Sequence, residues 1–300
     1  MEGCTVISKE AKDLMEQLRK TYVPVVDWEQ TDWEQFRADV LAMVPDGPYP
    51  QGVTFRSDTI SGVDTEWTVV EDASEKIILH FHGGGMCMGT ASIDRFMLSH
   101  IAVLTKRNAV SVEYRLSPEY AHPAAVEDCV AVYTGLLEQG YQAKDIVLLG
   151  ESAGGMLVMS VCAWLKQNHV EMPGAICAIS PSVDSRYQSQ SMLTNRETEL
   201  AVNLNLVEMM EAIYYCGVDP LDPIASPIHS DLHGWPPTYL MACRKEILRD
   251  EAVRMCVRLQ ESGVPCELTI EEELFHTYML HDIPESYEAF QKLAEFFSRY

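Results

Sequence analysis

A serine between two glycines lies where an apolar run meets a helix-like run. Residues 150–154 read Gly-Glu-Ser-Ala-Gly, after an apolar run that ends at Leu149 and before a helix-like run from Ala153 to Lys166. The bare five-residue pattern arises by chance in about one chain in ten of this length, so the flanking segments carry the argument. A strand before the serine and a helix after it are typical of a strained turn that exposes the hydroxyl at the C-terminal edge of a sheet. Ser152 is therefore a candidate nucleophile for acyl transfer.

A glycine-rich segment could hold the negative charge that acyl transfer creates. Residues 77–85 read Ile-Ile-Leu-His-Phe-His-Gly-Gly-Gly, a buried-strand pattern that runs into a loop. Glycines let backbone N–H groups approach a developing oxyanion, which side chains would obstruct. We assign the oxyanion hole to the N–H groups of Gly83, Gly84 and Ala153. The alternatives are a turn without chemistry and a phosphate-binding loop, but the G-x-x-x-x-G-K-[ST] motif of the latter does not occur in the chain.

A serine nucleophile needs a histidine base and a carboxylate that orients the histidine. In a strand–serine–helix arrangement the order along the chain is Ser, then acid, then His. His276 follows the last expected core strand through a short loop, which should bring it to the same sheet edge as Ser152; His281 is the second choice. The carboxylates that follow the strand expected at residues 238–242 are Glu246, Asp250 and Glu251.

Together these motifs resemble the hormone-sensitive-lipase-like family of α/β-hydrolases, also called bacterial family IV esterases. The resemblance covers roughly residues 76–300. It rests on His-Gly-Gly-Gly at 82–85, Gly-Glu-Ser-Ala-Gly-Gly at 150–155, Tyr-Arg-Leu-Ser-Pro-Glu at 114–119, Pro-Ala-Ala-Val-Glu-Asp at 123–128 and Pro-Pro-Thr at 236–238. It implies an α/β-hydrolase fold and a serine carboxylesterase that forms an acyl-enzyme intermediate.

The resemblance also implies which carboxylate is the catalytic acid. Residues 246–250 read Glu-Ile-Leu-Arg-Asp, which is similar to the family's pattern around the acid, with Glu where Asp is commoner. Glu246 is thus the expected acid, and Asp250 is expected to cap the following helix at its N-terminus. The family implies no cofactor and no metal, short-chain acyl esters (acetyl to butyryl or hexanoyl) as small-molecule substrates, and a possible homodimer. The expected walls of an apolar substrate pocket are Met86, Met88, Met209 and Tyr214.

Strand-like and helix-like segments alternate through most of the chain. Such alternation is typical of an α/β fold with a mostly parallel central sheet flanked by helices, with catalytic groups at the C-terminal ends of the strands. Core strands are expected at 76–82, 108–114, 145–149, 175–179, 238–242 and 266–271, and edge strands at 53–56 and 66–70. Helices are expected at 93–105, 123–139, 153–168, 250–262 and 284–298.

Two regions outside this alternation are expected to form a helical cap. Ala11, Leu14, Met15 and Leu18 have helical spacing, and residues 31–34 read as a capping box, Thr-Asp-Trp-Glu, before a second helix. A later insert is rich in Met and aromatic residues, which suit an adaptable pocket wall, although most of them should only pack helices. The expected parts are N-terminal cap helices at 1–45, the first part of the α/β-hydrolase core at 46–183, a cap insert at 184–217 and the second part of the core at 218–300.

Charge and cysteine usage exclude several function classes. The formal net charge is −23, which argues against nucleic acid and against anionic membrane surfaces as partners. The nine cysteines form no C-x-x-C pair, and their number and spacing favour reduced thiols in a cytoplasmic protein. Met1 to Thr5 lack the basic and apolar regions of a signal peptide, and no apolar run is long enough to span a membrane.

Two histidine environments lead to further expectations. A carboxylate of the acidic run Glu271-Glu272-Glu273 near His276 would raise the pKa of the imidazole, so that activity would rise through mildly alkaline pH. His82 should fix the glycine loop by hydrogen bonding. A metal site at His80 and His82 is disfavoured, because no third ligand has matching spacing.

Three other functions compete with the esterase. An amidase or a deacetylase of N-acyl or acetylated sugar substrates shares the chemistry, and the motifs do not separate it. A non-catalytic ligand-binding protein would be expected to have lost the histidine or the acid, but both are present. A lipase would favour an apolar lid, whereas the insert carries the polar residues Asp184, Arg186, Asn195, Arg196, Glu197 and Glu199.

Overall fold

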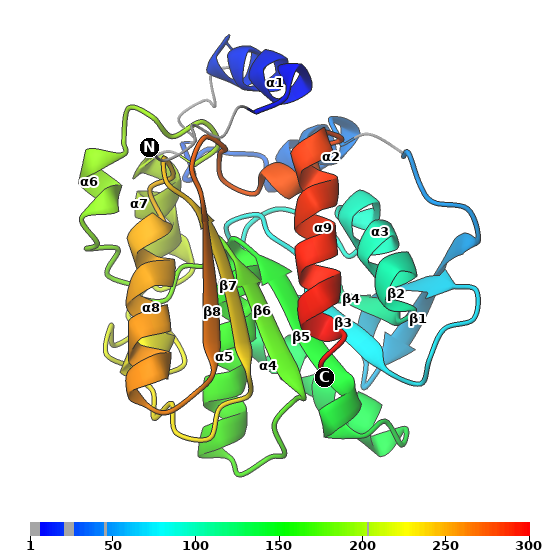
Figure 1. Ribbon diagram of the computed structural model, residues 1–300. Helices are drawn as coiled ribbons and strands as arrows, with labels where there is room; N and C mark the ends of the chain where they lie inside the picture. The colour runs from blue at the N-terminus through cyan, green and yellow to red at the C-terminus, as the bar shows by residue number, and fades with distance from the viewer. Residues whose placement is uncertain (1–6, 21–26, 45–46, 203) are drawn as a thin grey trace.

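The sheet at the centre of the fold runs in the order β1-β2-β4-β3-β5-β6-β7-β8 (Figure 1). This computed structural model describes residues 7–20, 27–44, 47–202 and 204–300. The strands are β1 (Val53–Ile60), β2 (Val63–Val70), β3 (Ile77–Phe81), β4 (Asn108–Val112), β5 (Ile146–Glu151), β6 (Ala175–Ile179), β7 (Thr238–Cys243) and β8 (Cys266–Glu271). From β4 to β8 all neighbours are parallel, and β2 is antiparallel to β1 and β4. The predicted α/β fold with a mostly parallel sheet is confirmed.

Helices cover both faces of this sheet. Residues of α3 (Arg95–Thr105) and α9 (Pro284–Phe297) pack on one face, and residues of α4 (Ala124–Glu138), α5 (Ala153–Gln167) and α8 (Arg249–Glu261) pack on the other. Alternate residues of β5 point to opposite faces of the sheet. Val147 and Leu149 pack with α3 and α9, whereas Ile146 and Leu148 pack with α4, α5 and α8. The expected strand β2 is not at an edge, since it lies between β1 and β4 and buries Trp67 and Thr68.

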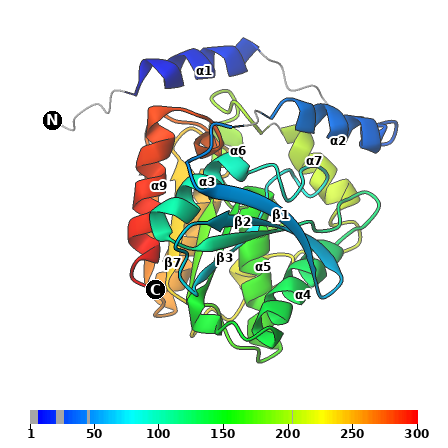
Figure 2. The same ribbon diagram turned by 90° about the vertical axis from the view of Figure 1, so that its right-hand side faces the viewer.

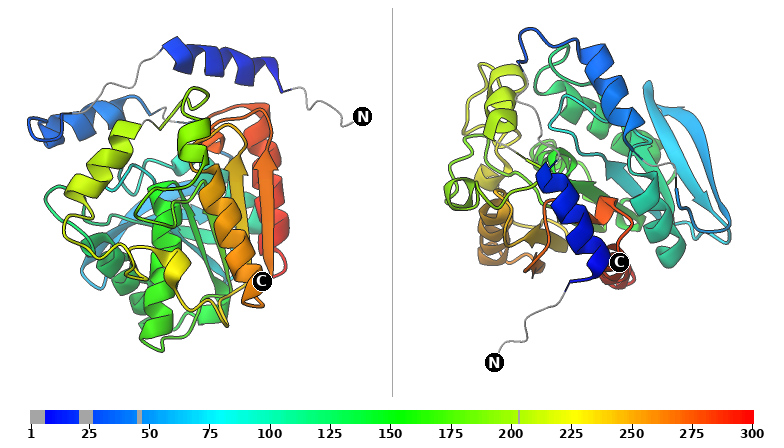
Figure 3. Two further views of the ribbon diagram at one scale, coloured as in Figure 1. Left: turned by 90° about the vertical axis from the view of Figure 1, so that its left-hand side faces the viewer. Right: turned by 90° about the horizontal axis from the view of Figure 1, so that it is seen from above.

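The helices outside this sandwich gather at one end of the molecule, as Figures 2 and 3 show. They are α1 (Lys9–Lys20), α2 (Trp33–Ala42), α6 (Ser191–Thr194) and α7 (Leu204–Ile213). Trp33 of α2 and Met209 of α7 share an apolar cluster with Cys87. The division into core and cap stays a prediction, and its first boundary, at 45/46, lies outside the described residues. No helix of the described part is long and apolar enough to cross a membrane.

Two predicted helix caps are wrong. The N-cap of α2 is Asp32, whose Oδ1 accepts from the N–H of Gln35 at 3.1 Å, while the hydroxyl of Thr31 donates to the carbonyl of Asp27. Asp250 does not cap α8 but lies in its first turn, where Oδ2 accepts from the N–H of Ser191 at 2.9 Å. Both errors have the same cause. The local sequence offers several carboxylates and hydroxyls near each helix start, and tertiary contacts decide which of them caps the helix.

Among the described glycines, the one with the least room for a side chain lies where the first turn of α5 meets the end of β3. A Cβ built on Gly154 would lie 1.8 Å from the carbonyl oxygen of Phe81, whereas a Cβ on the adjacent Gly155 would meet its nearest atom at 3.2 Å. Gly154 therefore has no room for any side chain, and Gly155 has room after a shift of a few tenths of an ångström.

We expect Gly154→Ala to lower the free energy of unfolding by about 3 kcal/mol or more, because the backbones of α5 and β3 must separate. Gly155→Ala serves as the matched control and should lower it by clearly less. Urea unfolding followed by circular dichroism measures both. Equal unfolding midpoints for the two variants would contradict the claim that position 154, unlike position 155, has no room for a methyl group.

Candidate active site

Ser152 occupies the turn between β5 and α5, as its flanking glycines predict. Its φ of 54° and ψ of −120° lie in a region that L-residues rarely adopt. The turn tolerates no side chain at Gly150, where a Cβ would lie 2.4 Å from the carbonyl oxygen of Gly154. The N–H of Ser152 donates to the carbonyl of Ile179 on β6 at 2.8 Å, and the residue stays half-buried. The strained turn thus holds the serine at the C-terminal edge of the sheet.

The structure brings together the three residues expected to form a catalytic triad. His276 Nε2 lies 2.9 Å from Ser152 Oγ, and His276 Nδ1 lies 3.1 Å from Glu246 Oε2. Glu246 follows β7 and His276 follows β8, so parallel strands deliver the acid and the base to the same edge. The second-choice base, His281, packs its ring on Phe275 instead. This chain of contacts can move a proton from the serine hydroxyl to the imidazole.

The segment that carries Glu246 is held by residues of the expected cap insert. Asn195 Nδ2 donates to the carbonyl oxygens of Arg244 and Glu246, each at 2.8 Å, and Ser191 Oγ donates to that of Ile247 at 2.6 Å. The carboxylate of Glu246 also accepts from Ser180 Oγ at 2.8 Å. Sequence reasoning missed these contacts, because it treated Asn195 as one polar residue of an exposed insert. Its position within a Met-rich and aromatic segment offered no distinguishing signal.

The same segment carries Glu199, which also holds the acid loop. Its Oε2 accepts from the N–H of Ile247 at 2.9 Å, while Oε1 accepts from the N–H groups of Leu200 and Ala201, each at 2.8 Å. One carboxylate therefore joins the backbone of the insert to the loop that carries the catalytic acid.

The electrostatic environment raises the pKa of His276 above its ordinary value of 6.5. Burial alone would lower that pKa, but the hydrogen bond to Glu246 and the charges of Glu246, Glu199 and Glu151 outweigh burial. The acidic run proposed from the sequence is not the source. Its members Glu271, Glu272 and Glu273 pair with Lys292, Arg244 and Lys245, respectively.

The glycine loop differs in one respect from the expected oxyanion hole. The N–H of Gly83 donates to Oε1 of Glu151, so it is already occupied. In the described part of the chain, the N–H groups of Gly84 and Gly85 have no hydrogen-bond partner, and φ is 115° at Gly84 and 58° at Gly85. Ala153 is the first residue of α5, so its N–H has no acceptor within the helix. The occupied N–H contradicts the assignment of Gly83 as a donor, and Gly85 is the candidate that replaces it.

His82 fixes the glycine loop, as the sequence predicts. Its Nδ1 donates to the carbonyl of Gly83 at 2.7 Å, and its ring stacks on Tyr114 at a centroid distance of 4.1 Å. The hydroxyl of Tyr114 donates to the carbonyl of His82 at 2.7 Å. The loop is also held from outside the core by Arg37 of α2, which sequence reasoning missed. Arg37 Nε donates to the carbonyl of Cys87 at 2.8 Å.

The four residues expected to line the substrate pocket differ in burial. Met86 and Tyr214 are fully buried in the main apolar core, so they can touch a substrate only if their neighbours move. Met88 is half-buried and packs with Met209 in the cluster around Trp33. Substrate contact by any of the four stays a prediction.

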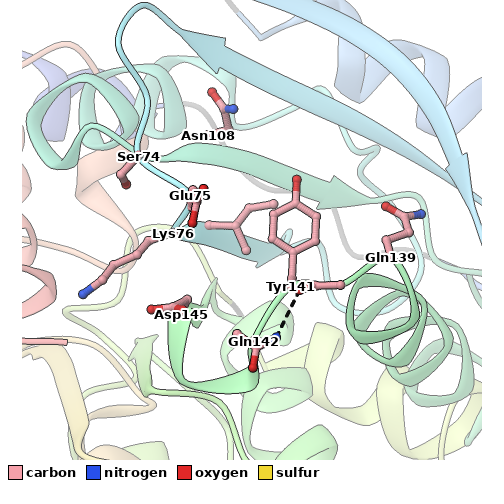
Figure 4. Close-up of a pocket in the computed structure, with 10 residues that line it drawn as sticks. Ser74, Glu75, Lys76, Asn108, Gln139, Tyr141, Gln142 and Asp145 are labelled. Atoms are coloured by element: carbon pink, nitrogen blue, oxygen red, sulfur yellow. Dashed lines mark hydrogen bonds between the residues drawn. The ribbon is translucent and has the colours of Figure 1, made fainter.

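A polar hollow of about 490 Å³ lies away from these residues (Figure 4). Its lining includes Asn108, the first residue of β4, and Asp145, which precedes β5. It is therefore at the opposite end of β5 from Ser152 and belongs to the other edge of the sheet.

Among the described residues, His80, Asp94 and Glu151 form a buried group whose nitrogen and oxygen ligand atoms lie within 4.8 Å of one another. Sequence spacing did not reveal this group, because it joins β3, the start of α3 and β5. His80 Nε2 lies 2.9 Å from Glu151 Oε2, which is a hydrogen-bond distance. The two side chains therefore satisfy each other by a hydrogen bond.

Comparison with known proteins agrees with this geometry. The family model described as alpha/beta hydrolase fold matches residues 78–280. An esterase of Acinetobacter venetianus is 28% identical over 253 residues, which cover 83% of this chain and 84% of that protein. An acetyl-hydrolase of Streptomyces hygroscopicus is 31% identical over 242 residues, covering 79% and 80% of the two chains.

Solved structures extend the likeness to nearly the whole chain. The crystal structure of an esterase from the bacterial hormone-sensitive lipase family superposes with a TM-score of 0.91 at 30% identity, covering 98% of this chain and 99% of that one. The esterase EstE5 superposes with a TM-score of 0.91 at 29% identity, covering 97% and 98%.

The raised pKa of His276 determines how activity should depend on pH. The base acts only when neutral, so kcat/KM should fall as the pH drops through a midpoint above 6.5. Glu246→Gln removes the partner that raises this pKa. We expect the midpoint to move to lower pH and the plateau to fall about 100-fold or more, because the imidazolium loses its stabilising charge.

Glu271→Gln is the matched control, since Glu271 pairs with Lys292 and not with His276. Its pH profile should coincide with that of the unaltered protein. A midpoint that moves as far in Glu271→Gln as in Glu246→Gln would restore the acidic run as the source of the shift.

Proposed function

The chain belongs to the α/β-hydrolase fold family, in its hormone-sensitive-lipase-like branch, and we propose that Ser152 hydrolyses short-chain acyl esters through an acyl-enzyme. The protein is a carboxylic ester hydrolase, like the esterase and acetyl-hydrolase relatives it matches. The observation that carries the mechanism is the hydrogen-bonded chain from Ser152 through His276 to Glu246, at 2.9 and 3.1 Å.

Acylation begins at the serine hydroxyl. Ser152 Oγ attacks the ester carbonyl carbon while its proton passes to His276 Nε2. The carboxylate of Glu246, at Nδ1 of the same ring, stabilises the imidazolium that forms. His276 then donates the proton to the leaving alcohol, and the acyl group stays on Ser152.

Backbone donors stabilise the tetrahedral intermediate. In this proposal, the N–H groups of Gly84, Gly85 and Ala153 donate to one oxyanion beside Ser152. The proposal is supported by the observation that none of these three N–H groups has an acceptor in the described protein. They act on the charge that develops on the carbonyl oxygen, where removal of one donor typically costs about 100- to 1,000-fold in rate.

Deacylation repeats these steps with water. His276 takes a proton from the attacking water, and the acid is released when the second tetrahedral intermediate collapses. Every proton moves between substrate, water and groups of this chain, so the proposal invokes no cofactor and no metal.

A small acyl group fits the surroundings of the glycine loop. A Cβ built on Gly85 would lie 3.0 Å from Leu206 Cδ1, so α7 lies directly against the loop. Met88 and Met209 pack beside Leu206 and are our candidates for the apolar wall of the acyl site. The acetyl-hydrolase relative favours acetyl esters among the possible substrates.

The free thiols of the described cysteines support a cytoplasmic location as part of this proposal. The homodimer implied by the family stays a prediction.

Hydrolysis of p-nitrophenyl acetate, butyrate, octanoate and palmitate tests the function. We expect kcat/KM to be highest for acetate or butyrate and to fall at longer chains, because α7 limits the depth of the acyl site. Ser152→Ala and His276→Asn should each lose about 1,000-fold or more in kcat/KM.

His281→Asn is the matched control for the base, because the His281 ring packs on Phe275, the neighbour of His276, and His281 has no hydrogen bond to Ser152 in the described residues. It should retain the activity of the unaltered protein. Activity that survives in Ser152→Ala would remove the proposed nucleophile, and a loss confined to His281→Asn would reassign the base.

A further inference from the structure

The buried group beneath the glycine loop plays no part in the proton transfers described above. Glu151 precedes the nucleophile in the chain, yet its side chain points away from the triad, toward His80 and Gly83. His80 and Glu151 are fully buried, and Asp94 is almost so. Three titratable side chains without contact with water require a specific arrangement of protons.

The hydrogen bonds determine the state of His80. Burial lowers the pKa of His80 to about 4, so the ring is neutral and carries one N–H. Because Nε2 faces the carboxylate of Glu151 at 2.9 Å, that N–H must be on Nε2. Nδ1 then accepts from the hydroxyl of Ser111 on β4 at 2.9 Å. His80 therefore supplies a donor to Glu151 and no positive charge.

The two carboxyl groups cannot both be charged. In the described residues no lysine or arginine pairs with Asp94 or Glu151, and the titratable groups that act on the pair are His80, Tyr114, Cys177 and His276. Burial raises the pKa of both carboxyls, and the charge of Glu151 raises that of Asp94 further. Two close buried carboxyls share one proton for this reason.

The position of the shared proton follows from the donors that each carboxyl meets. Glu151 accepts from the N–H of Gly83 and from His80, so its charge is stabilised at both oxygens. Asp94 Oδ2 is buried, receives no hydrogen bond from a donor among the described residues, and lies 3.8 Å from His80 Nε2. Asp94 is thus the neutral member, and its proton is the one in the side-chain hydrogen bond between Asp94 and Glu151.

We propose that Asp94 and Glu151 form a carboxyl–carboxylate pair that anchors the glycine loop through the N–H of Gly83 and so positions Gly84 and Gly85 to stabilise the oxyanion. The pair consists of positioning residues, because neither touches the substrate. Since Glu151 is joined to Ser152 by a peptide bond, the pair sets the distance between the nucleophile and the loop that faces it. This inference rests on the proposed ester hydrolysis.

The test compares Glu151→Gln and Asp94→Asn with Glu251→Gln. Glu251 is a matched control, because it is a fully buried carboxylate on α8 that accepts from the N–H of Val183 and pairs with Arg254. We expect Glu151→Gln to lower kcat about 10- to 100-fold with KM changed less than about twofold, because loosened donors weaken transition-state binding without changing ground-state binding. Asp94→Asn should lower kcat less, since Glu151 stays in place.

Affinity for a trifluoromethyl ketone provides a readout that a merely structural role would not move. The inhibitor forms an oxyanion on Ser152, so its Ki should rise in Glu151→Gln by the same factor as kcat falls. The pH midpoint should stay in place in Asp94→Asn, which keeps the charge of Glu151, and it should move to lower pH in Glu151→Gln, which removes one of the charges that raise the pKa of His276. The double variant should have the midpoint of Glu151→Gln, because Asp94 is neutral and adds no charge that acts on His276.

Several outcomes would overturn the proposal. One is a kcat of folded Glu151→Gln within about twofold of Glu251→Gln. Another is a shifted midpoint in Glu151→Gln with kcat and the inhibitor Ki both unchanged, because Glu151 would then act only as a charge on His276. Activity lost on dialysis against EDTA and restored by Zn²⁺ would make the group a metal site instead. Failure of the unaltered protein to hydrolyse any ester would count against the proposed function and not against the anchor.

Discussion

The contact between Gly154 and the carbonyl of Phe81 is the constraint on which the site depends. It lets the first turn of α5 lie directly on the end of β3, at a distance that excludes even a methyl group. Because Ser152 and Ala153 begin that turn and the glycine loop follows β3, one backbone contact places the proposed nucleophile beside the loop that holds the proposed oxyanion donors. A strand–turn–helix unit with any other residue at 154 would keep its secondary structure and lose this arrangement.

The other half of the site depends on two different supports. Parallel strands β7 and β8 bring Glu246 and His276 to the edge where Ser152 lies, which follows from topology alone. The loop that carries Glu246 is then fixed by Asn195 and by neighbouring residues from a segment 51 positions earlier in the chain. The insert is thus part of the catalytic framework as well as a cover, and its packing and the orientation of the acid are coupled.

Sequence reasoning recovers the features that depend on hydrophobic period and on the order of motifs along the chain. The α/β fold, the turn at Ser152 and the order of Ser152, Glu246 and His276 are encoded in local patterns, and the structure brings those three residues together. Sequence reasoning fails where a side chain forms a hydrogen bond with the backbone of a residue that is far away in the sequence. The local loop motif predicts Gly83 as a donor, whereas the N–H of Gly83 is occupied by Glu151, 68 positions later. No periodicity marks such a contact, and none marks the group formed by His80, Asp94 and Glu151.

The central claim is that the acyl group passes through Ser152. Rapid mixing with p-nitrophenyl butyrate, followed by an acid quench and peptide mass spectrometry, tests it most directly. The account predicts one butyryl group per chain on the peptide that contains Ser152, formed as fast as the first equivalent of p-nitrophenol. A butyryl group on another residue, or a fast release of p-nitrophenol with no acylated peptide, would contradict it.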